Sequence, residues 1–192
     1  MELNALYNSD FDEHAAVLAA TREALAAPYE ALTNICIKSI QQGGKILFFG
    51  NGGSASDSQH LATELTIRYV NDRPPIAAIA LTTDTSAITA AGNDIGFDNI
   101  FARQIEALGK AGDVAIGIST SGNSENVIRA LEMAKNMEIT PAAFGGRDGG
   151  LMNGVANPYL IVPSQTTARI QEMHILIGHL LCDGLERKLG LV

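Results

Sequence analysis

Residues 45–54 read KILFFGNGGS, a short apolar run that passes directly into a glycine-rich loop. An apolar run of this length between glycines is typical of a strand that is buried on both faces. The loop after it is typical of a junction between a strand and a helix, where glycine lets the backbone turn sharply. This stretch therefore predicts the start of an α/β sheet.

Four further apolar runs follow along the chain, at residues 76–81, 114–118, 141–144 and 159–162, and the third of these is the weakest. Helical patterns separate them, at residues 55–69, 84–108 with a break near 92–96, 124–137 and 167–188. Strands that alternate with helices form a parallel sheet with helices on both faces. We therefore expect a doubly wound α/β fold with a mostly parallel, five-stranded sheet, and ligands at the carboxyl ends of its strands.

The first 43 residues have a helical pattern, with apolar residues such as Leu18 and Leu25 at three- to four-residue spacing. Pro28 fits the first turn of a second helix, and Gly43-Gly44 fits its end. Two helices are too few for a separate domain. We expect a single domain over residues 1–192, in which helices within residues 1–43 pack at a subunit interface beside a sheet domain of residues 44–192.

The composition excludes several classes of function. Of the 192 residues 46% are hydrophobic, and the 13 Lys and Arg against 21 Asp and Glu give a net charge of −8. So acidic a chain argues against a nucleic-acid partner, since that binding relies on clustered Lys and Arg. No apolar run is long enough to cross a membrane. The N-terminus lacks a signal-peptide pattern, and Cys36 and Cys182 are expected to be reduced core residues, so we expect a cytoplasmic protein.

Two of the expected strand ends are followed by polar loops that could hold a phosphate. The first reads GNGGSAS from Gly50, and the second reads ISTSGNS at residues 118–124. Small residues let the backbone approach a ligand, and the N–H groups at the start of the next helix favour an anion. The same residue types also cap helices and form turns, but two such loops on one sheet favour a phosphate site. Neither loop matches a nucleotide-binding motif.

A second set of candidates is ionisable. His60 and Glu64 lie four residues apart on one face of an expected helix, and Gln171 and His179 lie on the last helix. His and Glu at this spacing suit a metal ion, although a solvated His–Glu pair and a structural histidine are also consistent with it. Gln171 and His179 are about 12 Å apart along the helix axis. Either the two residues serve one elongated site, or different subunits contribute ligands, and we favour a site at a subunit interface.

Together, GNGGS at residues 50–54, ISTSGNS at residues 118–124 and RIQEMH at residues 169–174 resemble the sugar isomerase (SIS) domain family, and within it the phosphoheptose isomerases. The resemblance covers nearly the whole chain. It implies an SIS-type fold, a homotetramer with active sites between subunits, and one zinc ion per subunit, held by His60, Glu64, Gln171 and His179. It places the catalytic base and acid at Glu64 and His179. The implied substrate-binding residues are Asn51, Gly52, Gly53, Asn93, Asp94, Ser119, Thr120, Ser121, Ser124 and Gln171.

The implied reaction converts sedoheptulose 7-phosphate to D-glycero-D-manno-heptose 7-phosphate through an enediol-type intermediate. It would be the first step toward nucleotide-activated heptose for the lipopolysaccharide core or other surface glycans. One position departs from the pattern: Ala168 stands where some members carry an acidic residue.

The segment from Thr167 to His174 also resembles a non-enzymatic SIS-domain protein that binds the replication initiator. In that relative the glutamate position is replaced, whereas Glu64 is present here. The retained glutamate favours an enzyme over this interaction protein, and also over a regulatory domain that only binds sugar phosphates.

Overall fold

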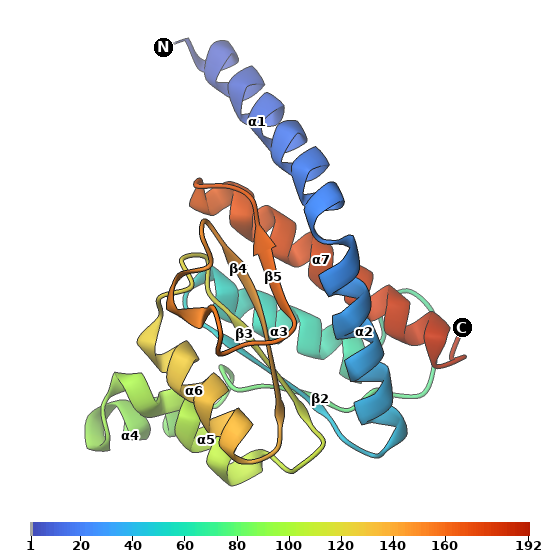
Figure 1. Cartoon of the computed structure of the whole chain (residues 1–192), viewed down its shortest axis with the longest axis vertical. Helices are drawn as coiled ribbons and strands as arrows, with labels where there is room; N and C mark the ends of the chain where they lie inside the picture. The colour runs from blue at the N-terminus through green and yellow to red at the C-terminus, as the bar shows by residue number, and fades with distance from the viewer. Residues whose placement is uncertain (1) are drawn as a thin grey trace.

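The computed structural model describes residues 2–192, and its centre is a sheet of five parallel strands (Figure 1). The strands lie in the order β2-β1-β3-β4-β5, which confirms the expected doubly wound α/β fold. β1 pairs with β3 from Ile46↔Val114 to Gly50↔Ile118, so the loops after these two strands begin side by side. The strands are β1 (Ile46–Gly50), β2 (Ala78–Ala80), β3 (Val114–Ile118), β4 (Thr140–Gly146) and β5 (Tyr159–Val162).

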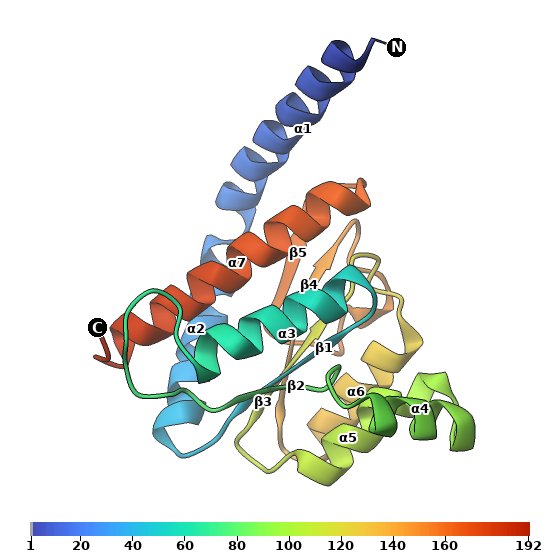
Figure 2. The ribbon, with the colours of Figure 1, turned by 180° about the vertical axis from the view of Figure 1, so that it is seen from behind.

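Each face of the sheet is covered by its own layer of helices. Successive side chains of a strand point to opposite faces, so Phe48 is buried in one hydrophobic core and Phe49 in the other. The layer on the Phe48 face contains α1 (Leu3–Ala24), α2 (Ala26–Gln41), α3 (Gly53–Thr66) and α7 (Thr167–Lys188). The layer on the Phe49 face contains α4 (Thr85–Asp94), α5 (Ile100–Leu108) and α6 (Glu125–Asn136). Figure 2 shows α3 and α7 side by side on the first face.

Two helices precede the sheet, as predicted. α1 ends at Ala24, with Leu25 as its C-cap, and Pro28 lies in the first turn of α2, where its missing N–H costs no hydrogen bond. The first half of α1 extends away from the rest of the molecule (Figures 1 and 2). Its apolar residues Leu3, Tyr7 and Phe11 are 83%, 61% and 60% exposed.

The expected elements differ from the observed ones mainly at their ends. The run at 76–81 forms a strand of only three residues, because β2 is the edge strand and pairs with β1 only at Ile46–Phe48. The weak run at 141–144 is part of a seven-residue strand that lies between β3 and β5. The helical pattern at 84–108 divides into α4 and α5 at a turn around Gly96, whose φ of +86° favours glycine. Within residues 2–192, no helix is long and apolar enough to cross a membrane.

Candidate active site

The first part of the site consists of the two loops that follow β1 and β3. Asn51 and Asn126 join these loops, because each side-chain amide donates a hydrogen bond to the oxygen of the other, at 2.8 and 2.9 Å. Gly50 comes so close to Ile118 that an added Cβ would collide with its carbonyl oxygen. Gly52 has a φ of +56°, which other residues rarely adopt. The close approach of the two loops explains the glycine at position 50, and the backbone conformation explains the glycine at position 52.

The loop after β3 places its hydroxyl groups at the start of α6. Ser124 is the N-cap residue of α6, and its Oγ lies 2.9 Å from Oγ of the buried Ser119. Thr120 and Ser121 are half-buried, and the N–H of Gly122 closes the turn by donating to the Ser119 carbonyl at 3.1 Å. Hydroxyl groups beside the N-terminus of a twelve-residue helix can bind an anion such as a phosphate.

The second part of the site lies between α3 and α7, where three of the four candidate metal ligands meet. Nε2 of His60 lies 2.9 Å from Nε2 of His179 and 3.3 Å from Oε1 of Glu64. The rings of His60 and His179 have centroids 5.1 Å apart, and the Tyr69 ring lies 5.5 Å from that of His179. Burial lowers the pKa of His179 and the neighbouring His60 lowers it further, whereas Glu64 opposes this shift.

Close packing of the two helices accounts for this meeting. A Cβ at Gly178 would collide with the side chain of Leu61, so the glycine lets α7 lie directly against α3. His60 and His179 are the sequence neighbours of these two residues and are therefore brought face to face. Glycine inside a helix is less favourable than alanine by about 0.5–1 kcal/mol, and the close approach gives a reason for it here.

Gln171 lies apart from the other three candidate ligands. Its amide faces Gly53 at the start of α3, where an added Cβ would meet it. It is eight positions before His179, a rise of about 12 Å along α7. Within one chain Gln171 is thus adjacent to the first loop, and a metal site that combines it with His60, Glu64 and His179 stays a prediction.

The remaining predicted site residues, Asn93 and Asp94, lie at the exposed end of α4. Asn93 donates a hydrogen bond to Oδ1 of Asp94 at 2.7 Å, and α4 itself has no buried residue. Asp94 lines a surface hollow of about 480 Å³ together with residues of β2 and α5 such as Arg103. Within this chain, the pair therefore belongs to a different surface from the one that holds His60 and Glu64.

Two further histidines and both cysteines have structural surroundings. His174 is buried, shares a hydrogen bond of 2.9 Å with the Gly145 carbonyl, and has its pKa lowered by burial to about 4. His14 is partly exposed and pairs with Glu172 at 2.8 Å. Cys36 and Cys182 are free and buried, as predicted, and burial raises the pKa of both thiols.

Sequence reasoning missed several residues that shape the site. Asp57 lies one turn before His60, burial raises its pKa, and within residues 2–192 its buried Oδ2 has no hydrogen-bond partner. Arg73 and Glu186 form a buried ion pair, and Arg73 also donates a hydrogen bond to the carbonyl of Glu64. An arginine in a polar loop and a glutamate near the end of a helix are common surface residues, so no local pattern indicated their burial. Gly178 is different, because a glycine inside a helical pattern can indicate that another element packs closely against the helix at that position.

Comparison of the sequence and of the fold with known proteins points to one family. The model of the SIS domain family matches residues 11–146. A phosphoheptose isomerase from Paramagnetospirillum magneticum is 58% identical over 186 residues, which cover 97% of each chain, and one from Helicobacter pylori is 50% identical over 185 residues, or 96% of each. The structure of a phosphoheptose isomerase from Neisseria gonorrhoeae matches with a TM-score of 0.91 at 43% identity, covering 97% of this chain and 100% of the other. One from Francisella tularensis matches with a TM-score of 0.94 at 38% identity and the same coverage.

Proposed function

This chain belongs to the phosphoheptose isomerases of the SIS domain family, and from this premise we propose how its residues divide the conversion of sedoheptulose 7-phosphate to D-glycero-D-manno-heptose 7-phosphate. The loops at the strand ends bind the phosphate, and the cluster between α3 and α7 moves the proton. The observation that carries this proposal is the convergence of His60, Glu64 and His179 on one point.

The phosphate end of the substrate is held without cationic side chains. Ser119, Thr120, Ser121 and Ser124 offer hydroxyl donors beside the first N–H groups of α6, whose helix dipole favours an anion. Asn51, Gly52 and Gly53 border the same space from the loop after β1, and Gln171 faces Gly53. Binding energy from this remote group positions the reacting carbons.

Isomerisation between a ketose and an aldose moves a proton between two neighbouring carbons. The Glu64 carboxylate takes the proton from the carbon beside the carbonyl group, while His179 donates a proton to the carbonyl oxygen, which leaves an enediol. Delivery of the first proton to the neighbouring carbon, while the hydroxyl proton of the other oxygen passes to His179, completes the reaction and restores both side chains.

A zinc ion fits the donors of this cluster. Two imidazole nitrogens and one carboxylate oxygen are ligands that zinc prefers, and here they already point at one another. The three groups are not a closed cage, and within residues 2–192 no group of three His, Cys, Asp or Glu is arranged to hold a metal ion. A fourth ligand, Gln171, would come from another subunit. When bound, the ion would polarise the carbonyl oxygen.

The surface supports a homo-oligomer, and we expect a tetramer. His60 is 47% exposed at its side chain, so the cluster opens outward from a single chain. His60 is seven positions after Gly53, so about 10 Å of helix separates the cluster from the loops. The exposed apolar residues of α1 and a hollow of about 330 Å³ between α1, α2 and α7 leave apolar surface for neighbouring subunits to cover.

Glu64 also bears on the interaction-protein alternative. The glutamate stands beside both histidines, where a protein that only binds a partner would not need a carboxylate.

The two buried free cysteines fit a reducing compartment, and we expect the enzyme to act in the cytoplasm. Ala168 immediately precedes Arg169, near the start of α7, and its effect on turnover is measurable by Ala168→Asp.

One experiment tests this proposal. The purified chain is incubated with sedoheptulose 7-phosphate before and after treatment with a chelator, and then after zinc is restored. We expect formation of the aldose, its loss with the chelator and its recovery with zinc. Activity that survives complete removal of metal would contradict the zinc site but not the isomerase, whereas no turnover with zinc present would contradict the isomerase.

Mixing two inactive variants tests whether subunits share a site. If His60 and Gln171 of one site come from different chains, a mixture of His60→Ala and Gln171→Ala chains contains some sites without either change, and activity partly returns. A mixture that stays inactive after proven subunit exchange would show that each chain builds its site alone.

A further inference from the structure

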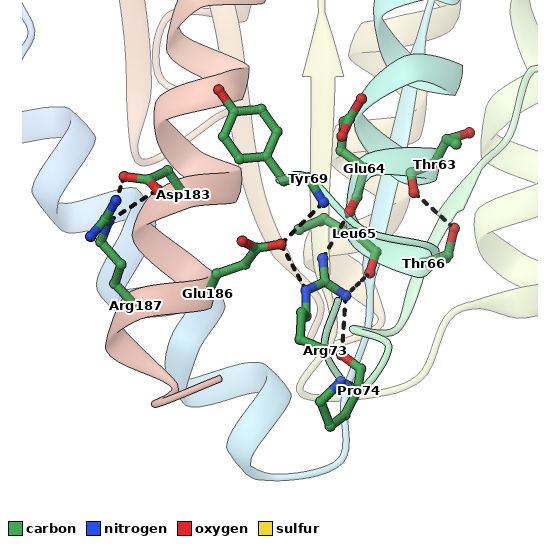
Figure 3. Close-up of polar contacts among 10 residues, drawn as sticks. All are labelled: Thr63, Glu64, Leu65, Thr66, Tyr69, Arg73, Pro74, Asp183, Glu186 and Arg187. Atoms are coloured by element: carbon green, nitrogen blue, oxygen red, sulfur yellow. Dashed lines mark hydrogen bonds and ion pairs between the residues drawn. The ribbon is translucent and has the colours of Figure 1, made fainter. Parts of the chain in front are cut away.

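A buried ion pair between Arg73 and Glu186 lies near the end of α3, and its contacts reach the backbone of the proposed base (Figure 3). Nε of Arg73 lies 2.7 Å from Oε1 of Glu186, and their side chains are 0% and 1% exposed. Arg73 belongs to the loop between α3 and β2, which passes beside the last turns of α7 (Figure 2), and Glu186 belongs to those turns. The pair therefore joins this loop to α7 in a place that water does not reach.

The remaining donors of Arg73 hold the end of α3. Its Nη2 donates to the carbonyl of Glu64 at 2.8 Å, and its Nη1 donates to the carbonyls of Leu65 and Pro74 at 2.7 and 3.0 Å. The carbonyls in the last turn of a helix have no partner within the helix, so a guanidinium group there satisfies them and complements the helix dipole. Arg73 thus fixes the backbone of the residue that carries the catalytic carboxylate.

Glu186 reaches the other side of the cluster. It lies seven positions after His179, which places both on the same face of α7. Its Oε1 also accepts a hydrogen bond of 3.1 Å from the backbone N–H of Tyr69, whose ring lies 5.5 Å from the ring of His179. One carboxylate oxygen therefore anchors both the arginine that holds Glu64 and the tyrosine that lies against His179.

From these contacts we propose that Arg73 and Glu186 are positioning residues of the isomerase. The pair fixes the position of the last turn of α3 relative to α7. It thereby sets the distance between the Glu64 carboxylate and the His179 imidazole. This inference rests on the proposed roles of Glu64 and His179. Proton transfer is sensitive to misplacement of about 1 Å, whereas binding of the distant phosphate is not.

The test separates this role from a general loss of stability. Arg73→Met and Glu186→Met each leave one buried charge without its partner, which should lower Tm by roughly 10 °C. The double variant removes both charges and should recover much of that Tm. Asp113→Asn is the matched control, because Asp113 pairs with Lys45 at 2.6 Å in a mostly buried ion pair that joins the starts of β1 and β3.

We expect kcat to fall at least about tenfold in both single variants, with KM for sedoheptulose 7-phosphate changed less than about threefold, all measured well below each Tm. The double variant should keep the low kcat despite its recovered Tm, because Glu64 still lacks its backbone donor. Asp113→Asn should keep kcat within about twofold of the unmodified enzyme even where its Tm is lowered by the same amount.

Two results would overturn the proposal while leaving the enzyme's function intact: single variants that keep kcat within about twofold, or a double variant whose kcat returns along with its Tm. If the unmodified chain itself shows no turnover with zinc present, the proposed function fails and this inference fails with it. The activity of the unmodified chain therefore distinguishes the two failures.

Discussion

The two halves of the site are positioned in different ways. The strand-end loops are held by backbone geometry: Gly50 lies against Ile118, and Asn51 and Asn126 exchange hydrogen bonds. The proton-transfer cluster is held by side chains between two helices, through the contact of Gly178 with Leu61 and the ion pair of Arg73 with Glu186. The difference predicts that changes in the loops act on binding, and changes between the helices act on the chemical step.

The largest effect is expected at Glu64. Glu64→Gln keeps the size of the side chain but removes the base, so kcat should fall by about 10²–10⁴ while KM changes little. Steady-state kinetics with sedoheptulose 7-phosphate measures both values. Glu132→Gln, on the exposed face of α6, is the control and should be indistinguishable from the unmodified enzyme. A Glu64→Gln enzyme with half of the original activity would show that Glu64 is not the base.

An intermediate effect is expected in the phosphate loop. Changing Ser119 and Ser121 together to Ala removes two donors to a charged group, so KM should rise by about 10- to 100-fold with a smaller change in kcat. Unphosphorylated sedoheptulose serves as the control substrate, since its turnover does not use these donors. Equal losses for both substrates would show that the loop shapes the site in general and does not bind the phosphate.

The smallest of the three effects is expected where the helices touch. Gly178→Ala should separate α3 from α7 at Leu61, moving His179 away from His60 and lowering kcat by about tenfold, with KM little changed. Gly92→Ala is the matched control, because Gly92 also lies in a helix but an added Cβ there meets open space, and it should raise stability by about 0.5–1 kcal/mol. If Gly178→Ala kept full kcat, close packing would not be what aligns the histidines.

The sequence predicted the sheet better than it predicted the cluster. Apolar runs such as 114–118 report burial directly, and this run coincides with β3. The strand-end loops follow from the same pattern, because parallel strands bring their carboxyl ends to one edge. The meeting of His60 with His179 depends on packing between helices over 100 positions apart, and no local pattern encodes it. The spacing of Gln171 and His179 predicted only that both side chains would have to extend toward each other to share one ion, and in this chain the Gln171 amide faces Gly53.

Arg73 and Glu186 show the same limit more sharply. Charged residues are usually exposed, so their burial follows only from the way the loop after α3 lies beside α7. Asn93 and Asp94 show a second limit of prediction from the sequence. The family resemblance placed them in the substrate site, yet in this chain they lie at the exposed end of α4. Their role would need contact with a site on a neighbouring subunit.

The central claim is that the strand-end loops hold the phosphate while Glu64 and His179 act on the carbons at the other end. A crystal structure of the slow Glu64→Gln variant with sedoheptulose 7-phosphate bound tests it most directly. We expect the phosphate among the hydroxyls of residues 119–124, and the first two carbons within about 3.5 Å of residue 64 and His179, from one subunit or two. A phosphate bound elsewhere, or reacting carbons far from both side chains in every subunit, would contradict the account.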